Sequence, residues 1–309
     1  MNTVTADTLA DALPDSPAEN PPMSYLDPAM SWVQHVTVRA IEWATGQRRL
    51  KLIYDAYRAD EAAAGDGPKP SFWDDMLRRT ALRPQFDRAA LDRIPASGPL
   101  LVVANHPYGL VDGFALCWLI NQVRPDFKLL INAVLVQAPE TREFLLAVDF
   151  SATAAARATN LRTRAEARRV LADGGAILVF PAGGISTAPD RWGRRPAMDS
   201  PWQPFAAQMQ QQARCPVVPI HFAGQNSRAF QVVSHFSRTV RLAMMTGEIT
   251  RRFGTALDIT IGEPIAAAEC AGIADRKALV GEMCRRTYAL AGIDTTRPGM
   301  IVDVPRALA

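Results

Sequence analysis

The sequence predicts an α/β fold with a mixed, largely parallel sheet flanked by helices and preceded by a helical N-terminal extension. From about residue 95, short apolar segments rich in β-branched residues alternate with segments of helical length, a pattern typical of strands joined by crossover helices. Several of these apolar segments have no polar face, as expected for strands that are covered on both sides. With 309 residues, of which 48% are hydrophobic, the chain can enclose a large core.

The N-terminal third has a different composition. The first residues are rich in Ala, Pro, Asp and Thr, which is typical of a mobile segment. Between residues 24 and 60 apolar side chains recur at three- and four-residue steps, which predicts one or two amphipathic helices, and Ser71 occupies the N-cap position of another. We therefore divide the chain into a disordered arm at 1–22, a helical N-terminal region at 23–95, an α/β domain at 96–295 and a C-terminal tail at 296–309.

The α/β domain is expected to contain six strands and five main helices. The strands are predicted at residues 99–104, 128–136, 176–181, 215–223, 238–245 and 256–262. The helices are predicted at residues 112–123, 139–148, 160–175, 202–213 and 275–290.

The charge and the cysteines limit the function classes. The net charge is +3, but the arm carries four acidic and no basic residues, so the remainder carries +7, which favours anionic partners. Four scattered cysteines form neither a disulfide framework nor a cluster with metal-ligand spacing, so we expect reduced, mostly buried thiols and no metal. Basic residues are not interleaved with aromatic ones as in nucleic-acid-binding modules, and we expect no nucleic-acid partner.

No apolar segment approaches the ~20 residues that a membrane-spanning helix needs. The N-terminus also lacks the basic start and apolar segment of a signal peptide. We therefore expect a cytoplasmic protein that meets lipids only from the membrane surface.

The segment LVVANHPYGLVDG raises the question of a catalytic pair. Asn105 and His106 follow a predicted strand, at the edge where open α/β sheets usually bind ligands. The turn through Pro107 and Gly109 can return Asp112 to the imidazole, and a carboxylate on one ring nitrogen leaves the other free to accept a proton. The simpler interpretation is that Asp112 only caps the following helix and His106 is an ordinary loop residue.

Two further segments could bind anions. FPAGGIS at 180–186 ends a predicted strand with adjacent glycines, whose backbone N–H groups can approach an anionic oxygen. DRWGRRP at 190–196 contains Arg191, which can clamp phosphate or carboxylate in bidentate fashion. Taken alone, the first segment is better explained as a glycine-rich turn between strand and helix, and the second as a solvated loop.

The order of three segments resembles a known family. NHPYGLVDG, FPAGGIS and VVPIHFAGQNS at 217–227 are similar to the ordered motif blocks of the lysophospholipid acyltransferase superfamily, which includes the glycerol phosphate and lysophosphatidate acyltransferases. The pattern is most similar to the hemolysin-like, lyso-ornithine-lipid acyltransferase branch, and the resemblance covers roughly residues 80–265. It implies that His106 is the general base and that Asp112 orients it.

The resemblance also implies substrate contacts. Phe180, Pro181 and Gly183 match the block that binds the polar headgroup of the acceptor, and Pro219 lies in the final block, beside the acceptor and acyl-chain pocket. The full set of predicted substrate-binding residues is Asn105, Gly109, Phe180, Pro181, Gly183, Gly184, Arg191 and Pro219.

The sequence departs from the family pattern in two places. Five residues separate His106 from Asp112, where the common motif has four. Ala182 replaces the usual glutamate of the second block, and Gly184 and Ile185 replace the usual Thr-Arg. The loss of both charged residues disfavours a simple glycerol phosphate acceptor.

The resemblance implies an O-acyltransferase that moves a fatty acyl group from an acyl carrier protein or coenzyme A thioester to the hydroxyl of a lyso-ornithine lipid or lysophospholipid. The thioester is a co-substrate, and no other cofactor is expected. Five arginines in the helical segment near 160–173 suit an acidic acyl carrier or an anionic surface on the inner face of the membrane: Arg157, Arg162, Arg164, Arg168 and Arg169. Two alternatives stay open, namely a catalytically silent lipid-binding protein of the same fold and a hydrolase that uses water.

Overall fold

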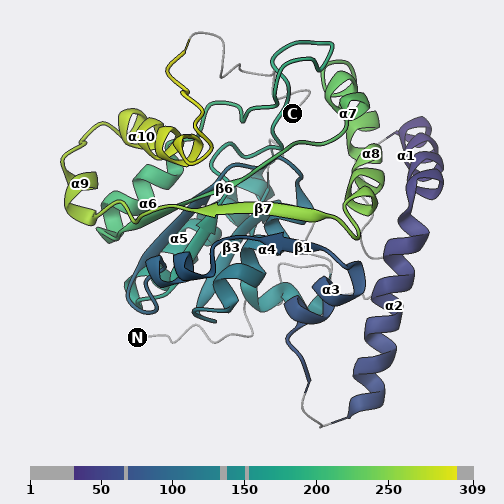
Figure 1. Ribbon diagram of the computed structural model, residues 1–309, viewed down its shortest axis with the longest axis horizontal. Coiled ribbons are helices and arrows are strands. Elements are labelled where there is room, and N and C mark those ends of the chain that lie inside the picture. The colour runs from purple at the N-terminus through teal and green to yellow at the C-terminus, as the bar shows by residue number, and fades with distance from the viewer. Residues whose placement is uncertain (1–30, 66–68, 133–137, 150–152, 298–309) are drawn as a thin grey trace.

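A computed structural model describes residues 31–65, 69–132, 138–149 and 153–297 of the chain (Figure 1). The expected arm at 1–22 and all but two residues of the expected tail at 296–309 lie outside these ranges. The described residues form a seven-stranded mixed sheet with helices on both faces, which confirms the predicted fold class.

The sheet has the strand order β1-β7-β6-β2-β5-β3-β4. Strands β2, β3, β4, β5 and β6 are parallel, β7 is antiparallel to β6, and β1 is parallel to β7. The carboxyl ends of five strands therefore meet at one edge. The strands are β1 (Arg83–Gln85), β2 (Leu100–Ala104), β3 (Phe127–Asn132), β4 (Leu145–Val148), β5 (Ala176–Val179), β6 (Val217–Phe222) and β7 (Ala256–Ile261).

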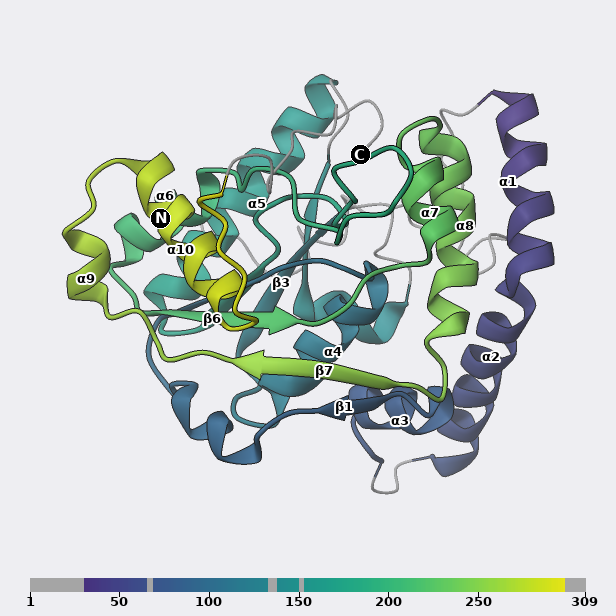
Figure 2. The same cartoon turned by 45° about the horizontal axis from the view of Figure 1, so that its top comes forward.

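Helices cover both faces of the sheet and one end. Helices α3 (Phe72–Thr80) and α4 (Leu110–Asn121) pack on one face, and α5 (Ala154–Ala172), α6 (Phe205–Ala213) and α10 (Arg276–Ala289) on the other. Beside the sheet, α8 (Arg238–Arg251) packs against α1 (Trp32–Thr45) and α2 (Gln47–Ala64), as Figures 1 and 2 show. The shorter elements are α7 (Arg228–Val233), α9 (Ala267–Ala271) and the 3-10 helices η2 (Arg88–Arg93) and η4 (Pro139–Phe144).

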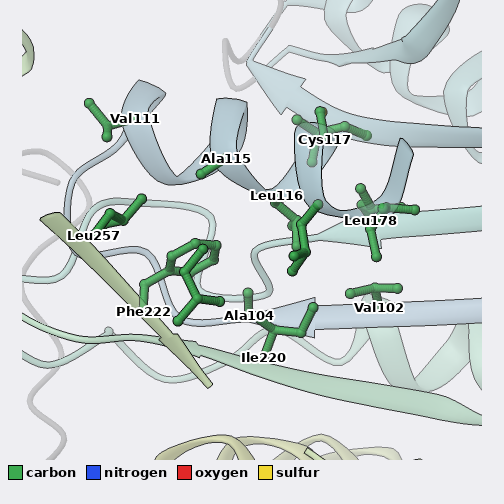
Figure 3. Close-up of a cluster of buried hydrophobic side chains, with 14 of the residues drawn as sticks. Val102, Ala104, Val111, Ala115, Leu116, Cys117, Leu178, Ile220, Phe222 and Leu257 are labelled. Carbon is green, nitrogen blue, oxygen red and sulfur yellow. The ribbon is translucent and has the colours of Figure 1, made fainter. Parts of the chain in front are cut away.

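The alternation of side chains along the strands produces two hydrophobic layers. Val102, Ala104 and Leu178 belong to the layer beneath α4, where they pack with Ala115 and Leu116 (Figure 3). The neighbouring strand residues belong to the second layer, which includes side chains of α5, α6 and α10: Leu101, Val103, Ile177 and Val179. Because both faces of β2 are covered, all five of its residues are buried, as the unbroken apolar segment predicted.

Two predicted features of the N-terminal region are confirmed. Within its described part, the segment between 24 and 60 forms α1 and most of α2, which continues to Ala64. Ser71 caps α3 by accepting a hydrogen bond from the N–H of Asp74 at 3.1 Å. The same region also supplies β1, which the sequence reading did not expect and which extends the sheet beyond β7. No helix in the described part of the chain is both long and apolar enough to cross a membrane.

The strand predicted at 238–245 is wrong, because these residues begin α8. Ser237 caps the helix by accepting a hydrogen bond from the N–H of Val240 at 3.3 Å. Met245 and Ile249 then occupy one buried side at helical spacing. A short apolar segment can fit the period of a strand or of a helix. Here the N-cap at Ser237 and the continuation of the pattern to Arg251 favour a helix.

The helix predicted at 139–148 is also wrong. Residues Pro139–Phe144 form the single 3-10 helix η4, and the next four residues form β4. Strand β4 pairs in parallel with β3, with Leu146 opposite Leu130. Sheet pairing at the edge therefore overrides the local helical pattern.

Candidate active site

A cavity of about 840 Å³ opens at the edge of the sheet where the parallel strands end. Most of the described side chains that line it are apolar, and they come from α3, α4, α6, α8 and the ends of β3 and β5. Of the residues predicted from the sequence, six lie on its wall: His106, Gly109, Phe180, Pro181, Gly183 and Gly184.

The imidazole of His106 lies against the carboxylate of Asp112, with 3.2 Å between Nδ1 and Oδ2. Asp112 is fully buried, whereas the His106 side chain keeps 18% of its surface exposed. The same Oδ2 accepts a hydrogen bond from the backbone N–H of Tyr108 at 3.1 Å. These partners assign the proton to Nδ1 and leave Nε2 as a base.

The loop between the two residues brings them together. Gly109 has a φ of 76°, a conformation that favours glycine, and it is the N-cap of α4. The helix begins at Leu110, so Asp112 lies in its first turn and its carboxylate returns to residues 106–108. Asp112 is therefore not the N-cap, which removes the simpler interpretation of this residue.

The plane of the imidazole is held by Phe180, the first residue after β5. The two rings stack with centroids 4.0 Å apart and an interplanar angle of 23°. In the same loop the N–H of Ser186 donates to the carbonyl oxygen of His106 at 2.8 Å. The segments around 106 and 180–186, separated in sequence, thus form one side of the cavity.

The glycine-rich loop presents backbone donors beside this pair. Gly183 has a φ of 71°, and its N–H donates to the carbonyl oxygen of Phe180 at 3.0 Å. The N–H groups of Gly184 and Ile185 donate to no residue that the structure describes. These two groups can therefore hydrogen-bond an anionic oxygen in the cavity.

Sequence reasoning missed a second buried carboxylate, Asp199. Its Oδ1 accepts from the N–H of His106 at 3.2 Å and from the hydroxyl of Ser186 at 2.5 Å, and its Oδ2 accepts from Nε1 of Trp202 at 2.8 Å. Burial raises the pKa of Asp199 above its usual value, against the opposing effect of the Ser186 and Trp202 hydrogen bonds. Asp199 thus joins the histidine loop to the glycine-rich loop.

Three predicted substrate-binding residues lie outside the cavity lining. The side-chain amide of Asn105 pairs with the backbone of Phe222, as donor at 2.9 Å and as acceptor at 2.7 Å, and so fastens the end of β2 to β6. Pro219 is buried within β6, opposite Val103 of β2. Arg191 is exposed in a loop whose backbone N–H groups donate to Asp190.

One arm of the cavity is apolar and aromatic. Trp73 of α3 packs against Phe114 of α4 with ring centroids 5.4 Å apart, and against Phe144 at 5.5 Å. Phe72 and Leu129 also line the cavity, and together with Trp73 and Phe114 they define this arm. Such a surface can accommodate an alkyl chain.

Arginine side chains also line the cavity, among them Arg164, Arg238, Arg241, Arg252 and Arg276. Arg164 belongs to the basic helix that the sequence marks, and its guanidinium lies 5.2 Å from the ring centroid of Phe205. The sequence gives no signal for Arg241, because α8 was predicted as a strand. The cavity therefore combines an apolar arm, a basic wall and an imidazole.

The fold and the site define an α/β protein with a histidine–aspartate pair beside a mostly apolar cavity. A family model described as "Acyltransferase" matches residues 71–295. The chain belongs to this acyltransferase family.

Two individual proteins resemble this chain. The lyso-glycine lipid O-acyltransferase of Phocaeicola vulgatus (strain ATCC 8482) is 24% identical over 182 residues, which are 57% of this chain and 62% of that protein's length. The crystal structure of the 1-acyl-sn-glycerophosphate (LPA) acyltransferase PlsC from Thermotoga maritima is similar with 17% identity and a TM-score of 0.42, over 87% of this chain and 86% of that one.

Proposed function

We propose that the protein transfers a fatty acyl group from a thioester to the hydroxyl of a lyso-lipid, with His106 as general base and Asp112 as its orienting partner. The observation that carries this proposal is the imidazole of His106, held by Asp112 at 3.2 Å and lining a mostly apolar cavity of about 840 Å³. Family membership supports the reaction class.

The geometry supports a single-displacement mechanism. Nε2 of His106 removes the proton from the acceptor hydroxyl as its oxygen attacks the thioester carbonyl carbon. The tetrahedral oxyanion can be stabilised by the free N–H groups of Gly184 and Ile185. When the intermediate collapses, the carbon–sulfur bond breaks and the thiolate takes the proton from the imidazolium. Asp112 stabilises the imidazolium in between.

The acceptor that we propose is a lyso-amino-acid lipid, such as a lyso-ornithine or lyso-glycine lipid. Ala182 and Ile185 occupy the positions where the family pattern has a glutamate and an arginine, so the loop has lost the charged side chains expected for a glycerol phosphate acceptor. The match to a protein named lyso-glycine lipid O-acyltransferase supports the same choice. A lysophospholipid is the competing acceptor.

We further propose that the protein works peripherally, on an anionic surface at the cytoplasmic face of a membrane. Trp192 and Phe236 are 57% and 62% exposed, and the loop before Trp192 is joined to the segment before Phe236 by a 2.8 Å hydrogen bond between Ala188 and His235. Arg191, beside Trp192, is exposed as well. Exposed aromatic and basic side chains together favour binding at a lipid interface. Four free, buried cysteines suit a reducing compartment.

The test is an acyl-transfer assay with purified protein. Acyl carrier protein and coenzyme A thioesters are each combined with lyso-ornithine lipid, lyso-glycine lipid or lysophosphatidate, and the products are identified by mass spectrometry. We expect a diacyl product with at least one lyso-amino-acid lipid. Free fatty acid as the main product would instead support the hydrolase alternative, and lipid binding without turnover of either donor would support the silent lipid-binding alternative.

A further inference from the structure

The guanidinium of Arg241 is fixed inside the cavity wall. This residue lies in the first turns of α8, is 2% exposed and lines the cavity. Its Nη1 donates to Oγ1 of Thr187 at 3.0 Å, its Nη2 donates to the carbonyl oxygen of Ile185 at 2.8 Å, and its Cζ lies 5.2 Å from the ring centroid of Phe230. Two hydrogen bonds to the loop at 185–187 and the contact with Phe230 of α7 therefore hold the group in one orientation.

No carboxylate compensates this buried charge within the described part of the chain. None of the ion pairs of the described residues includes Arg241, and the two hydrogen bonds use two of its five N–H groups. Burial, with a smaller contribution from the charge of Arg238, lowers the pKa of Arg241 to about 10, so the side chain is still protonated at neutral pH. An uncompensated buried cation is costly, and a ligand in the cavity can supply the missing anion.

Arg241 and His106 are attached to the same short segment. The guanidinium binds the carbonyl oxygen of Ile185 and the hydroxyl of Thr187, while the residue between them, Ser186, donates its N–H to the carbonyl oxygen of His106 at 2.8 Å. A molecule whose anionic group binds Arg241 is therefore held in a constant position relative to the imidazole. This arrangement suits an anchor for the molecule that His106 deprotonates.

We propose that Arg241 binds the carboxylate of the acyl acceptor's headgroup. The inference rests on the proposed function, since it assumes a lipid acceptor in this cavity. A guanidinium pairs with a carboxylate through two parallel hydrogen bonds, and the buried position admits a small planar anion. The phosphates of a coenzyme A or carrier-protein donor are the other source of anionic oxygen, and the exposed Arg238 and Arg164 on the same cavity suit them better.

The first experiment measures binding, which needs no turnover. The probes are an N-(3-hydroxyacyl)glycine, which carries a free carboxylate, and its methyl ester, titrated against the full-length protein by calorimetry. We expect R241Q to weaken binding of the acid by about 10- to 100-fold and to leave binding of the ester unchanged, because only the acid makes a charge-assisted bond. The surface variant R88Q, which removes the same charge from an exposed site outside the cavity lining, should bind both probes like the wild type.

The second experiment separates acceptor from donor. In steady-state assays R241Q should raise KM for the acid acceptor with little change in KM for acyl-coenzyme A. R241K keeps the charge but lacks the planar guanidinium with its paired N–H groups, so its KM for the acid acceptor should lie between those of R241Q and wild type. Equal affinity of the wild-type protein for acid and ester would overturn the inference, and so would a rise in the donor KM alone in R241Q. The comparison of acid with ester on the wild-type protein remains a test even if R241Q does not fold. Absence of acyl transfer by the wild-type protein would contradict the proposed function, whereas the calorimetric comparison of acid and ester would still test the role of Arg241.

Discussion

The buried carboxylate of Asp199 accepts a hydrogen bond from the backbone N–H of His106, 93 positions earlier in the chain, at 3.2 Å. His106 is thus held twice, through its side chain by Asp112 and through its backbone by Asp199. Because Asp199 also accepts from Ser186, it fixes the histidine relative to the glycine-rich loop that faces it.

Replacing Asp199 with Asn should reduce both stability and turnover. The amide nitrogen that replaces one carboxylate oxygen cannot accept a hydrogen bond, so either Ser186 or Trp202 loses its acceptor. An unsatisfied buried donor costs about 1–3 kcal/mol. Urea unfolding should report a loss of that size, and kcat should fall more than KM changes, because the base is displaced. The exposed Asp92→Asn serves as control. Wild-type kcat in a folded D199N protein would show that Asp199 does not position the base.

Gly109→Ala should destabilise the site by sterics as well as by backbone strain. A Cβ at this position would lie 2.8 Å from Cδ1 of Ile185 and from Cε of Met245, and the φ of 76° disfavours any side chain. Gly254→Ala is the matched control, with a φ of 74° and no atom within 4 Å of its Cβ. We expect the loss in unfolding free energy for G109A to exceed that for G254A by about 1–3 kcal/mol. Equal losses in unfolding free energy for G109A and G254A would mean that Ile185 and Met245 move aside without a cost.

Gly113→Leu should shorten the acyl chain that the enzyme prefers. Gly113 lines the cavity on α4, and its Cβ would have ordinary contacts at 3.8 Å with Leu129 and Phe180, so a larger side chain fits at its base and fills the apolar arm. We expect kcat/KM for long-chain thioesters to fall about 10-fold or more relative to short-chain ones. Gly281→Leu on α10, exposed and without neighbours, is the control. An unchanged chain-length profile in G113L would place the acyl chain elsewhere.

The sequence predicts the features that depend on local pattern. Strand β2, the turn at Gly109 and the pair His106–Asp112 all lie within one short stretch, so spacing and turn chemistry marked the two residues as candidates, and the family resemblance decided for a pair over a helix cap. The family pattern then connected this stretch to the loop that contains Phe180, which stacks on the imidazole.

The features that sequence reasoning missed depend on partners far away in the chain. Asp199 becomes meaningful only through its contacts with His106 and Tyr288, 93 and 89 positions away. Arg241 was not recognised because residues 238–245 were predicted as a strand, although they begin α8. A short apolar segment fits the two-residue period of a strand as well as the 3.6-residue period of a helix. Conversely, Asn105 lies beside the histidine in sequence, yet both atoms of its amide bond the backbone of β6.

His221 predicts a pH dependence of stability. Burial lowers its pKa from 6.5 to about 4, so between these values the unfolded chain binds a proton that the folded chain does not. The free energy of unfolding should therefore fall as the pH decreases from about 6.5 to about 4, by up to roughly 1.4 kcal/mol per pH unit from this group. Urea titrations across this range should show a shallower slope for H221Q than for wild type. An identical slope would exclude His221 as the source.

The most direct test of the central claim is the kcat/KM for acyl transfer of H106A, D112N and the double variant, each verified as folded by circular dichroism. Loss of the base should lower kcat/KM by about 10²- to 10⁴-fold. Because Asp112 acts through the imidazole, the account predicts that H106A/D112N is no slower than H106A alone. Wild-type activity in H106A, or losses that multiply in the double variant, would contradict it.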